Sequence, residues 1–208
     1  ASINIYLCCL LEKRIIESIP NWSGPFNNKH RLLILVSADG ITTLKRIASS
    51  YKCFIRHLGK EGGGNGLREL SWNHTTLHIR TKDSKWTYLQ MLLPQGELEA
   101  IDCINKKWKE KIMWHLECVR QNGTQRVAAL PLVRWENKET LNDLISDCEE
   151  IGALIFNPHV ITVEDGGLGV IDSAQVKAKR SFDPKGLLNP TKLKGWVSEE
   201  DLEIRKGI

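Results

Sequence analysis

The residues with the clearest capacity for chemistry lie in LSWNHTTLHIR, residues 70–80. If this segment is helical, His74 and His78 are four residues apart and lie on one face, with Arg80 nearby. Two imidazoles so placed can bind a metal ion or transfer protons. The zinc-protease pattern is not met, because Thr75 stands where its catalytic glutamate would be. The alternative interpretation is that both histidines are half-buried and bonded to backbone or to neighbouring threonines.

A second cluster of reactive side chains lies in NPHVITVEDGGLG, residues 157–169. His159 and Glu164 flank a short apolar segment that we expect to be a strand, and Asp165 and two glycines follow it. Carboxylates followed by glycines leave room for a ligand to approach the backbone. A tight turn with solvated acids is the alternative, and the residues by themselves favour it.

Hydrophobic periodicity predicts the elements that must position these clusters. The expected helices are residues 3–19, 41–51, 96–111 and 137–151, the last with Asn137 as its cap and Gly152 as its stop. The expected strands are residues 31–37, 53–58, 87–94, 112–119, 126–135, 153–156 and 159–164. Asn122-Gly123 predicts a hairpin. We therefore expect an α+β fold, with a mainly antiparallel sheet, helices on one face and ferredoxin-like β-α-β units.

Length and composition are those of an ordinary globular protein. The chain has 208 residues, of which 41% are hydrophobic and 26% charged, and its formal net charge is +4. The basic residues are dispersed, since the longest mixed run is KKWKEK at 106–111, so nucleic-acid binding is not favoured. The apolar run at residues 5–11 is too short to span a membrane.

Cysteine usage and the amino-terminal sequence predict an intracellular protein, without deciding between cytoplasm and organelle. The six cysteines form no C-x-x-C pair and no metal-finger spacing, so we expect reduced core residues. Residues 5–11 lack the basic flank and cleavage site of a signal peptide. Because the chain begins with Ala1, we expect a processed product or a fragment.

The glycine-rich segment GKEGGGNG, residues 59–66, is predicted to be a surface loop and not a phosphate-binding loop. A P-loop places its lysine after the last glycine and immediately before a helix, whereas Lys60 precedes the glycines.

A stiff segment, SFDPKGLLNP at residues 181–190, lies near the carboxyl terminus. Asp183 and Asn189 each precede a proline, which disfavours helical backbone at both positions. A glycine permits a tight bend, and Leu187 and Leu188 offer an apolar pair to bury. We therefore predict a rigid turn, not a helix, that docks on another part of the protein.

These carboxyl-terminal residues carry a resemblance to a known family. NPHVITVEDGG followed by AQVKAKRSFDPKGLLNPTKLKGW resembles the end of FAD-linked oxidases of the vanillyl-alcohol oxidase and p-cresol methylhydroxylase type, in the glycolate oxidase and D-lactate dehydrogenase branch. The specific element is a helix with basic residues followed by Asp-Pro-x-Gly-Leu-Leu-Asn-Pro. LRELSWNHTTLHIR and WTYLQMLLP are also similar to such flavoproteins, so the resemblance covers residues 31–196.

The resemblance implies a cap domain that covers a flavin and holds substrate, and a carboxyl-terminal segment that returns to the FAD-binding domain. It implies that Asn189 points its amide towards the flavin and that Glu164 lies near the reaction centre. Oxidation would transfer a hydride from a 2-hydroxy acid or similar small alcohol to FAD while a base takes the hydroxyl proton. His74, His78 and His159 are candidates for that base.

Substrate binding would fall to arginine, because a guanidinium matches a carboxylate in bidentate fashion. Arg80 and Arg134 are the candidates. The expected organisation is a helix and loop (1–30), a cap domain (31–172), a segment that contacts the FAD domain (173–196) and a polar tail (197–208).

The sequence departs from the family pattern at Thr191, where glycine is common, and at Asp165, where histidine is usual. No glycine-rich loop supplies the FAD pyrophosphate site, so we expect that this chain alone binds FAD weakly and needs an FAD-binding domain or subunit as partner. Two alternatives stay open: a cap-like binding domain that has lost the flavin half, and a small metal-binding domain based on His74 and His78.

Overall fold

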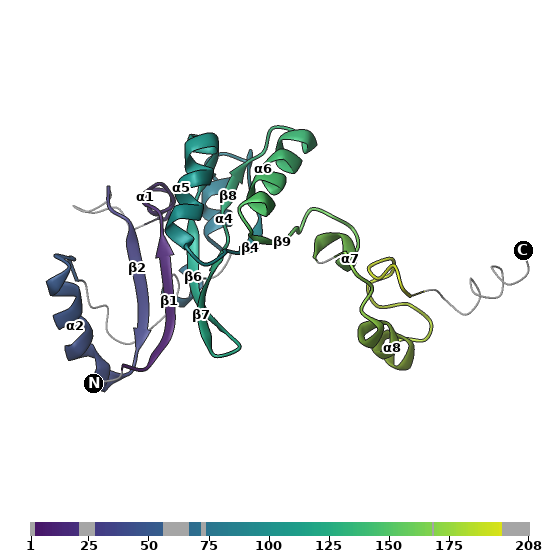
Figure 1. Ribbon diagram of the computed structural model, residues 1–208, viewed down its shortest axis with the longest axis horizontal. Coiled ribbons are helices and arrows are strands. Elements are labelled where there is room, and N and C mark those ends of the chain that lie inside the picture. The colour runs from purple at the N-terminus through teal and green to yellow at the C-terminus, as the bar shows by residue number, and fades with distance from the viewer. Residues whose placement is uncertain (1–2, 21–27, 56–66, 72–73, 168, 197–208) are drawn as a thin grey trace, which may run out of the picture. The chain divides into compact units, whose positions relative to one another are not determined.

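The computed structural model describes residues 3–20, 28–55, 67–71, 74–167 and 169–196. The chain divides into two compact units, Ala1–Leu154 and Ile155–Ile208. We refer to them as the N-terminal unit and the C-terminal unit and describe each by itself (Figure 1). The predicted segment GKEGGGNG, part of the first histidine cluster and the polar tail lie outside the described residues.

A six-stranded sheet is the centre of the N-terminal unit, with the strand order β2-β1-β6-β7-β4-β9. The pairs β1–β2, β1–β6, β6–β7 and β4–β7 are all antiparallel, and the first four strands lie side by side in Figure 1. The strand bounds are Ile5–Leu11 (β1), Arg31–Val36 (β2), Gln90–Leu92 (β4), His115–Gln121 (β6), Thr124–Ala129 (β7) and Leu154–Phe156 (β9). The boundary between the units falls within β9.

A second, three-stranded sheet and several helices complete the N-terminal unit. The sheet has the order β3-β8-β5, with bounds Trp86–Tyr88, Leu132–Arg134 and Ile112–Met113. The α-helices are α1 (Lys13–Ile16), α2 (Ile41–Ser50), α3 (Leu67–Leu70), α4 (His74–Arg80), α5 (Glu97–Trp108) and α6 (Lys138–Glu150). Two 3-10 turns are η1 (Ala38–Gly40) and η2 (Lys109–Lys111). The predicted α+β fold with a mainly antiparallel sheet is confirmed.

The connection from β4 through α5 to β6 is a split β-α-β unit. Both β4 and β6 run antiparallel to β7, so they are parallel to each other with β7 between them. The hairpin predicted at Asn122-Gly123 joins β6 to β7, with positive φ of 50° and 78° at its two turn residues. Such values are those of a type I′ turn, which matches the twist of the flanking strands.

Helices cover both faces of the six-stranded sheet, and the prediction of helices on one face was wrong. Neighbouring residues of a strand point to opposite faces. In β6, His115 bonds to Thr75 of α4, whereas Leu116 faces a cavity that residues of α5 also line. The hydrophobic core on the α4 side includes Leu11, Ile15 and Leu132, all of which are fully buried.

The amino-terminal helix predicted at residues 3–19 was wrong, because residues 5–11 form β1 and only Lys13–Ile16 is helical. The seven residues of β1, IYLCCLL, form a continuous apolar run, which lacks the alternation of a half-buried strand and therefore also fits helical spacing. The strand predicted at 53–58 is not formed by residues 53–55, and its remainder lies outside the described residues. The first β-α-β unit is therefore not formed by the described residues.

The described residues of the C-terminal unit form two helices, α7 (Val163–Gly166) and α8 (Ser173–Phe182). The strand predicted at 159–164 was wrong, because the side chain of Thr162 accepts a hydrogen bond from Asp165 N and caps α7. Asp172 caps α8 through the backbone N–H groups of Ala174 and Gln175. Among the described residues, no helix is long and apolar enough to cross a membrane.

Candidate functional site

The helical condition for the first histidine cluster is met over residues 74–80, which form α4. His78 is half-buried, while the side chain of His74 lies outside the described part of the chain. Thr75 and Thr76 are buried on the same helix. The described residues contain no group of three or more His, Cys, Asp or Glu side chains arranged to hold a metal ion.

The two arginines predicted to bind substrate meet at Trp86 of β3. Arg80 Nη1 donates a hydrogen bond to the carbonyl oxygen of Trp86 at 3.1 Å. Arg134 is the strand partner of Trp86, and its guanidinium carbon lies 5.8 Å from the indole centroid. Arg134 Nη1 also lies 3.3 Å from a carboxylate oxygen of Asp83. Both guanidinium groups therefore already have partners, and an incoming carboxylate would compete with Asp83 for Arg134.

A buried histidine that the sequence reasoning missed, His115, joins β1, α4 and β6. Its Nδ1 lies 3.0 Å from Thr75 Oγ1, and its Nε2 lies 3.1 Å from Cys9 Sγ and 3.4 Å from Glu117 Oε1. Burial, and then the charge of Glu117, raises the pKa of the Cys9 thiol well above its usual range. A protonated thiol is a poor nucleophile, so the raised pKa leaves Cys9 unactivated, while the contacts of His115 connect β1, α4 and β6.

Glu164, the predicted acid near a reaction centre, is buried within the C-terminal unit. Its Oε1 accepts hydrogen bonds from the backbone N–H groups of Lys194 and Gly195, at 3.0 and 3.4 Å. Burial by itself would raise the pKa of this carboxyl, but those hydrogen bonds outweigh it and hold the pKa below its usual range. Glu164 Oε2 is buried without a hydrogen-bond partner among the described residues.

His159, the remaining candidate base, lies in the turn that precedes α7. Its side chain is exposed, and its backbone N–H donates to Asn157 Oδ1 at 2.9 Å. The candidate residues are thus divided between the units: the α4 histidines, Arg80 and Arg134 belong to one, and His159, Glu164 and Asn189 to the other.

The turn predicted at residues 181–190 is formed over residues 183–190, and Asp183 closes it. The two carboxylate oxygens of Asp183 accept hydrogen bonds from Leu187 N and Leu188 N, each at 2.9 Å. Lys179 of α8 donates to both Asp183 Oδ2 and the Leu188 carbonyl oxygen. The Lys179 hydrogen bond lowers the pKa of Asp183, so the carboxylate is charged at neutral pH. The prediction that residues 181–182 are not helical was wrong, because α8 continues through Phe182.

Trp196 fixes the same turn from its other side. Gly186 has φ of +65°, and a Cβ there would lie only 2.1 Å from the Trp196 ring, so glycine is required. The result is a rigid turn that presents its apolar residues outward. The exposed fractions of Leu187 and Leu188 are 74% and 65%, and Asn189 is exposed with a left-handed φ of +46°.

A cavity in the N-terminal unit also escaped the sequence reasoning. Its volume is about 470 Å³, and it lies between β1, β6 and α5. No spacing in the sequence indicates this cavity, because its lining comes from four separate segments of the chain, around residues 10–14, 30, 98–110 and 114–116.

Comparison of the chain with models of known protein families gives no match, and comparison with curated proteins gives none either. The functional interpretation therefore depends on the residues and geometry described above.

Proposed function

We propose that this chain is the cap and carboxyl-terminal part of an FAD-dependent oxidoreductase that oxidises a 2-hydroxy acid or a similar small alcohol. The observation that carries the proposal is the turn closed by Asp183. It is held by two backbone hydrogen bonds, a lysine and a tryptophan, yet it leaves Leu187 and Leu188 exposed. A turn this ordered with an apolar surface suits a permanent partner, and the family resemblance suggests an FAD-binding domain.

The strand order supports the cap assignment. The elements β4, α5, β6, β7, α6 and β9 occur in this order in the chain, with η2 and β5 inserted before β6 and β8 inserted before α6. Their strands take the order β6-β7-β4-β9 in the sheet. This is the β-α-β-β-α-β arrangement of ferredoxin-like domains. An antiparallel sheet with packed helices is what the resemblance implies for the cap.

The residues of the turn could contact the flavin ring, but they do not make up a complete FAD-binding site. Asn189 is exposed, and its amide can both donate and accept, as contact with a flavin ring requires. FAD, when bound, would supply the hydride acceptor. We assign the pyrophosphate and adenine contacts of FAD to the partner.

In this proposal the remaining candidate residues have separate roles. Arg80 and Arg134, which meet at Trp86, bind the carboxylate of a hydroxy acid. His78 or His159 takes the hydroxyl proton. Glu164 orders the backbone of Lys194 and Gly195 and so positions the segment that follows the turn.

The test is the flavin content of the protein isolated from its source cells with an antibody against the N-terminal unit. We expect about one FAD per chain, measured by flavin fluorescence after acid release, and bleaching of the bound flavin by lactate or glycolate without oxygen. A colourless protein that remains folded would contradict the proposal and favour a binding domain without flavin. Stoichiometric zinc that is lost in His78→Ala would favour the metal-binding alternative.

A further inference from the structure

The cavity of the N-terminal unit has an apolar floor and a polar wall. Leu10 of β1, Leu116 of β6, and Leu98 and Ile101 of α5 form the floor. The wall consists of Glu12, Arg14, His30, Asn105, Lys109, Glu110 and Trp114. A volume of about 470 Å³ with a mostly apolar lining and a few polar groups is typical of small-molecule sites.

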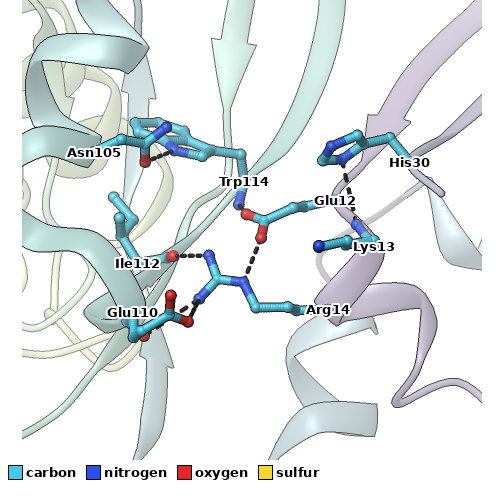
Figure 2. A network of polar contacts seen from close by, with 8 residues as sticks. All are labelled: Glu12, Lys13, Arg14, His30, Asn105, Glu110, Ile112 and Trp114. Carbon is cyan, nitrogen blue, oxygen red and sulfur yellow. Dashed lines mark hydrogen bonds and ion pairs between the residues drawn. The ribbon is translucent and has the colours of Figure 1, made fainter. Parts of the chain in front are cut away.

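The polar wall is held in place by hydrogen bonds, which Figure 2 shows around Arg14. Arg14 donates to Glu12 Oε1, to Glu110 Oε2 at 2.9 Å and to the carbonyl oxygen of Ile112 at 2.5 Å. Glu12 Oε2 accepts from Trp114 N at 2.9 Å. The two carboxylates of the wall are therefore both paired with Arg14, and the wall is built before any ligand arrives.

The indole of Trp114 is fixed in the same way. Its Nε1–H donates to Asn105 Oδ1 at 2.8 Å, as Figure 2 also shows, so the ring is held between β6 and α5. The satisfied indole N–H leaves the apolar part of the ring to line the cavity.

Lys109 and His30 each leave a donor available in the wall, next to the exposed carboxylate of Glu110, whose Oε2 is paired with Arg14. Lys109 Nζ has no hydrogen bond or ion pair within the described part of the chain. His30 Nδ1 accepts from Lys13 N at 3.3 Å, as Figure 2 shows, which leaves the proton on Nε2. An available ammonium and an imidazole N–H favour an anion over a cation.

Lys109 also has an unusual backbone conformation. Its φ and ψ are 43° and −118°, a region in which glycine is common and other residues are rare. A lysine in this position costs free energy that a glycine would not, and strained residues of this kind cluster at ligand sites. Lys109 lines the cavity and directly follows α5 in the chain.

We propose that this cavity binds a small apolar monocarboxylate, with the apolar chain over Leu10, Ile101 and Leu116 and the carboxylate at Lys109 and His30. The site lies wholly within the N-terminal unit and does not depend on the flavin proposal. Failure of one proposal leaves the other standing, because one is measured by flavin content and the other by ligand binding.

The experiment is isothermal titration of the full chain with octanoate, octan-1-ol and octylammonium at neutral pH and low salt. We expect octanoate to bind with one site per chain, and the alcohol and the ammonium to bind more weakly. Lys109→Gln should weaken octanoate binding about threefold to tenfold and leave octanol binding unchanged, because it removes one charge-assisted hydrogen bond. Ile101→Trp should abolish octanoate binding by filling the cavity.

Lys106→Gln is the matched control, since it removes the same charge three residues earlier, in the last turn of α5 and outside the cavity lining. Equal weakening by Lys106→Gln and Lys109→Gln would reveal a general charge effect and overturn the proposal. Octanol binding as tight as octanoate binding would also overturn it. Unchanged octanoate binding in an Ile101→Trp protein with a normal circular dichroism spectrum would place the ligand elsewhere.

Discussion

The N-terminal unit buries aliphatic side chains from two sheets and from the helices packed on them, whereas the C-terminal unit buries mainly Ile155 and Val176 among its described apolar residues. Two carboxylates, those of Glu164 and Asp183, are buried in the C-terminal unit instead. Each accepts two backbone hydrogen bonds. Packing thus stabilises one unit, and ionised hydrogen-bond acceptors stabilise much of the other, so the two should respond differently to mutation and to pH.

The largest change in stability should come from a substitution that leaves an unfilled space in the core of the N-terminal unit. Leu144 of α6 is fully buried, and Leu144→Ala should lower the free energy of unfolding by about 3 kcal/mol, through lost transfer energy and an unfilled cavity. Urea denaturation followed by circular dichroism measures this loss. Leu98→Ala is the control, because 73% of Leu98 is exposed and its replacement should change the same free energy by less than about 0.5 kcal/mol. Equal losses in the two variants would contradict a packing-dominated unit.

Gly186→Ala should be the most damaging small change in the C-terminal unit. The new methyl group would lie 2.1 Å from the Trp196 ring, and the alanine would have to adopt the positive φ of Gly186. Together these two penalties should lower the free energy of unfolding of the unit by more than about 1 kcal/mol. Amide hydrogen exchange of Leu187 and Leu188 should accelerate. Gly123→Ala is the matched control, since its φ is +78° but no atom lies within 4 Å, so only the backbone penalty remains. A smaller loss of unfolding free energy in Gly186→Ala than in Gly123→Ala would contradict the close contact with Trp196.

Acid should loosen the C-terminal unit first. The pKa of Asp183 is lowered by Lys179, and that of Asp165 by Lys194; the pKa of Glu164 is lowered as well, by backbone hydrogen bonds that outweigh its burial. A carboxyl with a lowered pKa in the folded state adds stability above its unfolded pKa, about 4, and loses it as the pH falls through the folded value.

The nuclear magnetic resonance signal of the Trp196 indole reports this transition, because Trp196 packs on the turn. Below about pH 4 we expect it to shift towards its unfolded position before the methyl signals of Leu132 and Leu144 change. Simultaneous loss of all these signals would show that the two units are stabilised in the same way.

The smallest effect concerns strain in the N-terminal unit. Lys109→Gly should raise the free energy of unfolding by up to about 1 kcal/mol, because glycine adopts a positive φ without steric cost. Lys106→Gly lies within α5 and should lower that free energy by a similar amount. Urea denaturation of both variants measures the difference. A loss of stability in Lys109→Gly would contradict the strained conformation.

Short-range signals in the sequence predicted much of the N-terminal unit. The Asn122-Gly123 turn, the Asn137 cap, whose side chain accepts from Thr140 N at 2.7 Å, and the left-handed Gly152 after α6 were all confirmed. Each depends on the chemistry of one or two residues and little on distant parts of the chain.

The errors arose where tertiary pairing decides the outcome. Residues 5–11 have helical spacing, but pairing with β2 and β6 makes them a strand. The predicted strands 87–94 and 126–135 are each divided between the two sheets, at Leu89 and at Leu130 and Pro131. A one-dimensional pattern cannot show which sheet a strand joins.

The candidate site shows the same contrast between features that neighbouring residues encode and features that depend on tertiary contacts. The sequence predicted a rigid turn at residues 181–190, and it forms over residues 183–190, because prolines, a glycine and an aspartate encode it locally. The meeting of Arg80 and Arg134 at Trp86, the buried His115 network and the cavity of about 470 Å³ all depend on contacts between distant segments. No spacing between neighbours in the sequence could have indicated them.

The central claim is that the turn closed by Asp183 forms part of a flavoprotein, and FAD retention by the protein from its source cells tests it most directly. We expect the wild-type protein to keep its flavin absorbance through gel filtration and Asp183→Ala to lose it, because Leu187 N and Leu188 N lose their acceptor. Asp165→Ala, which removes an exposed carboxylate from the same unit, should retain the flavin. A wild-type protein without flavin, or an Asp183→Ala protein that keeps it, would contradict the account.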